Sequence, residues 1–243
     1  MKRNVLFSLI MLAAGALMAA DPSPKDDVTS AAQKLAAKDN YGWKTTVETP
    51  GGGGGGGRFR PGPTEGKTEK DGATFLSMTR GDNTIEAVLK GDKGAIKTED
   101  GWKTLAEATQ GGDGQPNPGM FLARMLKNFK SPAAEVENLA GKVKELKKAE
   151  DAYSGELTEE GAKQLLTFGP RPGGGDGPTV SDAKGSVKFW ITDGVLSKFQ
   201  TKVQGKVSFN GNDRDVDRTT TVEIKDVGKT KVSVPDEAKS KLT

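Results

Sequence analysis

The stretch Gly185–Val203, GSVKFWITDGVLSKFQTKV, decides the fold class. Its first half places apolar side chains at every second position, at Val187, Phe189 and Ile191, which is the period of a β-strand. Asp193-Gly194 follows, and Asp-Gly favours the primed turns whose twist matches that of two paired strands. The pattern therefore predicts an antiparallel hairpin.

The second half of the hairpin alternates as well, and its two faces differ in polarity. One face carries Val195, Ser197, Phe199, Thr201 and Val203. The other face carries Leu196, Lys198, Gln200, Lys202 and Gln204. One side of this hairpin thus faces water, and the other needs a cover of apolar residues.

Downstream of a polar link, two more strands are expected. They run over Thr219–Lys225 and Lys229–Val234, and Pro235 is expected to end the sheet because proline cannot donate to a β-ladder.

Upstream, several helices are predicted from capping residues and apolar spacing. Their ranges are Ser23–Asn40, Gly119–Phe129, Ala133–Ala140 and Glu159–Thr167, with Ser23, Ser131 and Thr158 as caps and Gly141 as a C′ residue. Between them, strands are expected at Tyr41–Thr49, Ala73–Arg80, Asn83–Lys90, Gly94–Thr98 and Trp102–Glu107. The stretch from Lys142 to Leu157 fits either a continued helix or a hairpin turning at Glu150-Asp151, and we favour the hairpin. The order of elements predicts an α+β fold with a mostly antiparallel sheet covered by helices.

Met1–Ala20 is typical of a secretory signal peptide. Lys2 and Arg3 precede a short apolar run, and Ala19-Ala20 offers a small-residue cleavage site. An uncleaved anchor helix is the alternative, but the run is short for a bilayer. We therefore expect an exported protein, periplasmic or extracellular, whose residues 21–243 form a single domain.

Composition excludes several classes of function. The chain has 243 residues, a formal net charge of +3 and neither cysteine nor histidine. Disulfides, thiolate or imidazole metal sites and histidine bases are therefore absent. Without Lys2 and Arg3, 34 basic residues face 33 acidic ones, and these charges are interspersed, which argues against nucleic-acid binding. No cofactor is expected.

Two Gly/Pro-rich stretches, at about 50–66 and 169–179, are expected to be loop insertions. Gly51–Gly57 is followed by Arg58 and by Pro61-Gly62-Pro63, where a phosphate-binding loop needs a helix. A solvated loop is therefore the preferred interpretation.

Four stretches together resemble a known family. They are Tyr41–Val47 (YGWKTTV), Asp100–Trp102 (DGW), Met120–Phe129 with Tyr153–Leu166, and Val187–Val234. In this order they resemble the extracytoplasmic lipid and lipoprotein carriers of the LolA and LprG/LppX types. The resemblance implies an unclosed, strongly curved half-barrel with an N-terminal helix and short lid helices on its concave face. The chain departs from the LprG type in lacking a cysteine for lipidation, and Arg80 and Arg124 are the candidates for the arginine that couples lid to barrel in the LolA type.

This resemblance implies a soluble, monomeric carrier that binds lipid acyl chains or acylated lipoproteins without catalysis, with envelope membrane proteins as possible further partners. The residues expected to line its apolar cavity are Trp43, Leu122, Met125, Leu126, Phe129, Leu165, Leu166 and Phe189. The alternative interpretation for each is ordinary core packing.

Two other functions remain open at this point. The same scaffold with a filled core would be a non-catalytic sensor or protein-interaction module of the envelope. An enzyme is the third hypothesis, although the sequence shows no nucleophile motif and no positioned pair of carboxylates.

Overall fold

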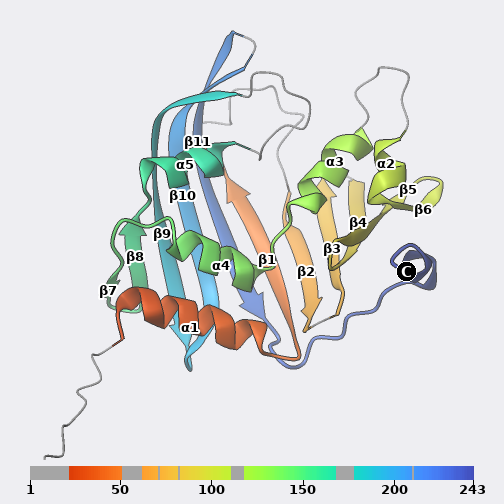
Figure 1. The fold of residues 1–243 in the computed structure, drawn as a ribbon, viewed down its shortest axis with the longest axis horizontal. Helices are drawn as coiled ribbons and strands as arrows, with labels where there is room; N and C mark the ends of the chain where they lie inside the picture. The colour runs from red at the N-terminus through yellow and green to blue at the C-terminus, as the bar shows by residue number, and fades with distance from the viewer. Residues whose placement is uncertain are drawn as a thin grey trace, which may run out of the picture.

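The protein is built on one antiparallel sheet of eleven strands, seen in Figure 1 of the computed structural model. The structure describes residues 22–50, 62–70, 72–81, 83–110, 118–167, 178–209 and 211–243. The strands are β1 (Asn40–Glu48), β2 (Thr64–Glu69), β3 (Thr74–Arg80), β4 (Asn83–Lys90), β5 (Lys93–Thr98), β6 (Gly101–Thr104), β7 (Lys147–Ala149), β8 (Ala152–Glu156), β9 (Thr179–Thr192), β10 (Val195–Phe209) and β11 (Asn212–Lys225).

The strand order is β6-β5-β4-β3-β2-β1-β11-β10-β9-β8-β7. Two meanders therefore meet where β1 pairs with β11, the last strand in the chain. The sheet does not close, since β6 and β7 remain its edges. The predicted α+β fold with an open, curved sheet is confirmed.

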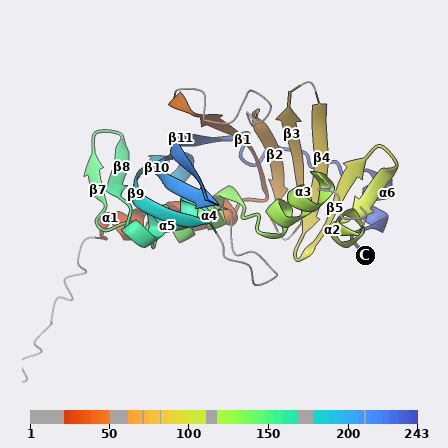
Figure 2. The same ribbon diagram turned by 90° about the horizontal axis from the view of Figure 1, so that it is seen from above.

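The helices cover the sheet in two groups (Figures 1 and 2). They are α1 (Pro24–Ala36), α2 (Leu105–Thr109), α3 (Pro118–Lys127), α4 (Pro132–Ala140), α5 (Glu159–Leu166) and α6 (Asp236–Ser240). The helices α1 and α4 pack together over the β9–β10 half, where α5 also lies, whereas α2 and α3 pack over β5 and β6. The short α6 contacts the edge strand β6.

The predicted caps form as the sequence indicated. Ser23 accepts a hydrogen bond from the Asp26 amide at 3.2 Å, and the Asp26 carboxylate accepts from the Ser23 amide at 3.1 Å. Ser131 and Thr158 cap α4 and α5 with their side-chain oxygens alone, which accept from the amides of Ala134 and Gly161. Gly141 differs from the prediction: it is the C-cap itself, with a right-handed φ of −72°.

The hairpin at Asp193-Gly194 is confirmed, since both residues have positive φ, 52° and 72°. One detail of its faces was wrong. A β-bulge between Leu196 and Lys198 shifts the register against β9, so Leu196 turns to the core and is buried. Alternation from sequence assumes an unbroken ladder, and a bulge breaks that assumption.

The closing strands are longer than predicted and end earlier. The supposed polar link is strand, because β10 runs to Phe209 and β11 starts at Asn212. Residues 213–215 of this arm are exposed, so no apolar pattern marks it. Lys229–Val234 is not a strand. The sheet ends at Lys225, and Pro235 instead precedes α6.

Two further elements differ from the prediction. Strand β2 lies partly inside the expected 50–66 insertion, and its sequence TEGKTE contains no apolar residue that could indicate it. The predicted strand Trp102–Glu107 stops at Thr104, where Thr104 and Glu107 form a capping box that starts α2. The remaining meander strands and the hairpin that turns at Glu150-Asp151 are confirmed.

Other predictions lie outside the described residues. These are the signal peptide, Gly51–Gly57 with Arg58, and most of the second Gly/Pro-rich stretch. The single-domain boundary at 21–243 stays a prediction.

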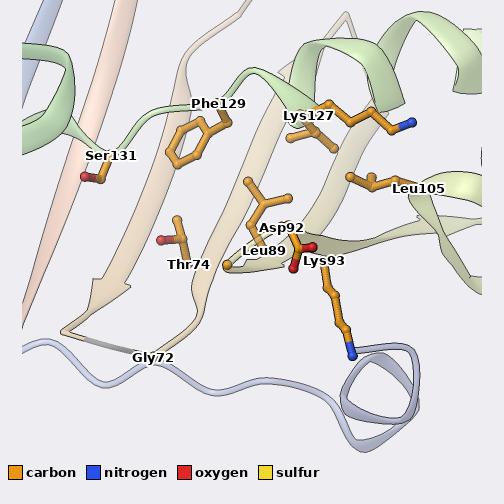
Figure 3. Close-up of a pocket in the computed structure, with 11 residues that line it drawn as sticks. Gly72, Thr74, Leu89, Asp92, Lys93, Leu105, Lys127, Phe129 and Ser131 are labelled. Atoms are coloured by element: carbon orange, nitrogen blue, oxygen red, sulfur yellow. The ribbon is translucent and has the colours of Figure 1, made fainter. Parts of the chain in front are cut away.

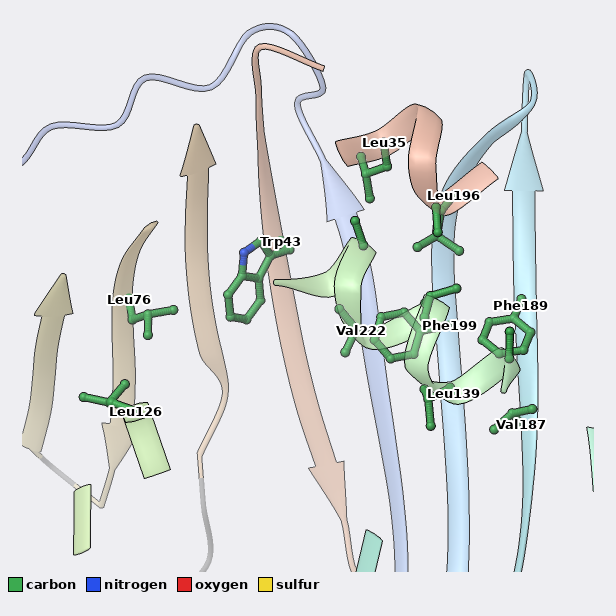
Figure 4. Packing of buried hydrophobic residues seen from close by; sticks show 14 of the residues in the cluster. Leu35, Trp43, Leu76, Leu126, Leu139, Val187, Phe189, Leu196, Phe199 and Val222 are labelled. Atoms are coloured by element: carbon green, nitrogen blue, oxygen red, sulfur yellow. The ribbon is translucent and has the colours of Figure 1, made fainter. Parts of the chain in front are cut away.

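The core beneath α1 and α4 is closely packed. Figure 4 shows Phe199, Val222 and Leu139 gathered between β10, β11 and α4, with Phe189 facing the same layer from β9. Leu35 reaches this layer from α1 and is fully buried. This half of the sheet is therefore held to its helices by continuous apolar contact.

A smaller apolar cluster lies on the opposite, convex face. Val88, Ala95 and Trp102 pack there against Ala238 of α6. The chain after β11 thus returns along the sheet and covers apolar residues that would otherwise face water. An ion pair from Lys241 to Glu107, at 3.0 Å, ties the same terminus to α2.

We expect Ala238→Asp to lower the free energy of unfolding by about 2 kcal/mol, because it buries an unpaired charge against Trp102. Urea unfolding followed by circular dichroism measures the change. Lys239→Ala, on the exposed side of α6, is the control and should shift stability by less than about 0.5 kcal/mol. Equal stability of the two variants would show that α6 does not pack on Trp102.

Candidate functional site

Trp43 occupies the centre of the sheet, where the two meanders meet. Its indole lies flat on Gly66 of β2, since a Cβ built on Gly66 would be only 2.1 Å from the ring. The indole Nε1–H donates a hydrogen bond of 3.2 Å to Thr68. On its other side the ring stacks on Phe129, with centroids 5.8 Å apart and planes 19° apart. Trp43 is thus fixed from three directions.

A cavity of about 320 Å³ lies beside this stack, between α4, α5, the end of α3 and the strands β1 and β11. Its lining residues are Trp43, Thr45, Met125, Asn128, Phe129, Lys130, Pro132, Glu135, Asn138, Leu139, Lys142, Leu165 and Val222. Trp43, Leu139 and Val222 are buried and form an apolar floor. Met125 is 38% exposed and lies at the mouth. We call this space the main cavity.

A smaller pocket of about 210 Å³ lies on the far side of Phe129. Figure 3 shows Phe129, Thr74 and Leu89 facing one space beneath the link between α3 and α4. Leu126 and Leu105 complete its apolar wall, while its remaining lining is polar or glycine. The ring of Phe129 therefore lines both spaces and separates them.

The predicted site residues divide into three groups. Trp43, Met125, Phe129 and Leu165 line the main cavity. Leu126 and again Phe129 line the smaller pocket. Leu122, Leu166 and Phe189 line neither space and pack in the core, where Phe189 is fully buried. That any of these residues binds a ligand stays a prediction.

Sequence reasoning missed the polar side of the main cavity. Glu135, Asn138 and Lys142 follow each other at helical spacing along α4 and just past it. Pro132 and Leu139, which also line the cavity, lie on the same face. The sequence could have indicated these residues, because their helical spacing places them beside the apolar residues of the same helix face.

Two charged groups of the cavity wall have shifted pKa values. Desolvation raises the pKa of Glu135 to about 7, against the opposing effect of Lys130 and Lys142. Desolvation also lowers the pKa of Lys142, and the positive charge of Lys130 acts in the same direction. The wall therefore holds charges in a partly apolar setting.

Arg218 of β11 connects the sheet to the helical cover. Its guanidinium donates a hydrogen bond to the carbonyl of Leu165, in the last turn of α5, and burial lowers its pKa. A cation suits the carboxyl end of a helix. Of the two arginines named from the resemblance, Arg124 is exposed on α3. The side chain of Arg80 lies outside the description, so that candidate stays a prediction.

Neither a metal site nor a membrane span is found in the described ranges. No three acidic side chains gather there in a way that could hold a metal ion. No helix among the same residues is long and apolar enough to cross a bilayer.

Among known proteins, this chain is similar to solved structures at low identity. No protein-family model and no curated protein matches the sequence. The chain is similar to the lipoprotein LppX of Mycobacterium tuberculosis, with 13% identity over 89% of this chain and 100% of that one, and a TM-score of 0.48. It is also similar to LprF of Mycobacterium bovis, with 11% identity over 88% and 97%, and a TM-score of 0.44. LppX is of the type that the sequence resembles, and the family of this chain stays a prediction.

We expect Gly66→Ala to displace the indole of Trp43, because the added methyl group would overlap the ring. Overpacking of this kind costs roughly 1–3 kcal/mol of stability. Urea unfolding and a shift of tryptophan emission measure the two effects.

Gly141→Ala is the matched control. A Cβ there meets its nearest neighbour at 3.4 Å, on a right-handed backbone, so stability should change little. Unchanged tryptophan emission in Gly66→Ala would contradict the close packing of Trp43.

Proposed function

We propose that the protein is an exported, soluble carrier that binds a lipid acyl chain or an acylated lipoprotein in the main cavity, without catalysis. The proposal includes a periplasmic or extracellular location after cleavage near Ala20, a monomeric state, and exchange with the envelope membrane or its proteins. The observation that carries it is the cavity with an apolar floor between the sheet and its helices.

The size and lining of the cavity suit one chain. Its volume of about 320 Å³ is near the lower end of the ~300–1,000 Å³ usual for ligand pockets. Each methylene transferred from water into such a site contributes about 0.8 kcal/mol. A chain of ordinary length would therefore bind by partition alone, with no covalent step.

The cover near Phe129 is the part that we propose to move when a chain is loaded. Met125, Asn128 and Phe129 come from the end of α3 and the link that follows, and all three line the cavity. Methionine adapts its shape readily, so Met125 at the mouth suits a site that opens and repacks. We propose that a chain enters when this link moves and Phe129 leaves its stack on Trp43.

A non-catalytic sensor or protein-interaction module is the second candidate. A different observation favours it: Phe189, Phe199 and Leu196 fill the space beneath α1, α4 and α5, each at most 1% exposed. A scaffold with only a small cavity would then serve to present its surface to a partner.

Native mass spectrometry of residues 21–243, expressed to the periplasm, separates the two candidates. We expect a stoichiometric adduct whose organic extract contains an acylated species. A clean apo mass, together with no uptake of a fluorescent fatty acid, would reject the carrier and favour the interaction module.

The site of binding is tested with a pair of neighbouring variants on β1. Thr45 lines the cavity, whereas Thr46 is exposed on the opposite face of the same strand. We expect Thr45→Phe to fill the cavity and weaken binding of a fluorescent fatty acid at least tenfold, equivalent to about 1.4 kcal/mol. Thr46→Phe should bind as the wild type does. Equal affinities would place the chain elsewhere.

A further inference from the structure

The main cavity has a polar rim on one side. Lys130 precedes α4 and is exposed, while Lys142 follows α4 and is half-buried, and both line the cavity. Neither ammonium group lies at ion-pair distance from an acidic residue in the described part of the chain. Desolvation and the charge of Lys130 lower the pKa of Lys142, while Glu135 and Glu160 act on it in the opposite direction.

We propose that Lys130 and Lys142 bind the anionic headgroup, a carboxylate or phosphate, of the amphiphile whose chain occupies the main cavity. This inference rests on the proposed function and adds the chemical class of the ligand. Two lysines with no carboxylate at ion-pair distance gain most from an anion placed between them. The apolar floor of Trp43, Leu139 and Val222 then accepts the chain that the anion carries.

Glu135 lies in the same cavity wall, and its ionisation determines how anion binding at the two lysines changes with pH. Its carboxyl group accepts no hydrogen bond from the described residues, and its pKa is near 7. The charged groups around it are Lys130 and Lys142, and Glu160 of α5 acts in turn on Lys142. Below about pH 7 Glu135 is neutral and both lysines are free to act on an anion. Above it, the carboxylate opposes the anion.

The test compares amphiphiles that share one chain and differ in headgroup. Dodecanoate, monododecanoylglycerol and dodecyltrimethylammonium are titrated into the wild type by calorimetry, below their micelle concentrations. We expect dodecanoate to bind about fivefold to tenfold tighter than the neutral glyceride, as two partly exposed charge pairs would provide. The cationic amphiphile should bind weakest.

The lysines are tested through the ratio of the acid and glyceride affinities. Lys130→Gln with Lys142→Gln should bring this ratio close to one. Lys144→Gln is the matched control, since Lys144 is exposed, pairs with Glu156 and does not line the cavity. The wild-type ratio should fall as pH rises through about 7, whereas Glu135→Gln should remove this fall. A ratio unchanged in the double variant would overturn the proposal.

The remaining outcomes separate the headgroup proposal from the carrier proposal. If the glyceride binds and dodecanoate binds no tighter, the headgroup site is rejected and the carrier stands. If no amphiphile binds, both proposals are rejected. Inorganic phosphate is also titrated alone. If it binds saturably at micromolar concentration and both lysine substitutions abolish this binding, the lysine pair is a site for a free anion and the headgroup proposal is overturned.

Discussion

The packing of Trp43 on Gly66 is the contact on which the centre of the structure depends. Strand β1 joins the two meanders, so its side chains must fit both halves of the sheet at once. A glycine opposite Trp43 lets the indole lie flat, and the hydrogen bond to Thr68 fixes its rotation. The ring then offers a flat surface to Phe129, whose position separates the main cavity from the smaller pocket. The shape of the site therefore depends on the contact between the Trp43 side chain of β1 and the Gly66 backbone of β2.

Much of the fold was predictable, because periodicity and capping are local properties of the chain. The hairpin at Asp193-Gly194 and the helices capped by Ser23 and Ser131 depend on residues close in sequence. Strand β2 was not predictable in this way. Its residues are polar or glycine, and it is a strand because its backbone pairs with both β1 and β3. The Leu196 bulge is likewise a property of the paired strands and of neither strand alone.

The residues of the candidate site were likewise predictable only in part from local sequence. Apolar spacing on α3 and α5 led to Met125, Phe129 and Leu165, which do line the main cavity. The same spacing also selected Leu122 and Leu166, because a stripe does not distinguish a residue facing a space from one facing another side chain. The wall residue Glu135 was overlooked because a search for an apolar cavity passes over charged residues, although it lies on the cavity-facing side of α4.

The two groups of helices are held to the sheet in different ways, and this difference bears on how the cavity opens. Helices α1 and α4 rest on a filled layer that includes Leu35 and Phe199, and α5 is tied to β11 through Arg218. The end of α3 instead lies between two spaces, with Phe129 stacked on one ring. Moving α4 would expose a continuous apolar layer to water, whereas moving the α3–α4 link would separate Phe129 from Trp43. Within the proposed carrier, we therefore expect the cover to open first at Phe129, where the firmly packed helices end and the cavity mouth begins.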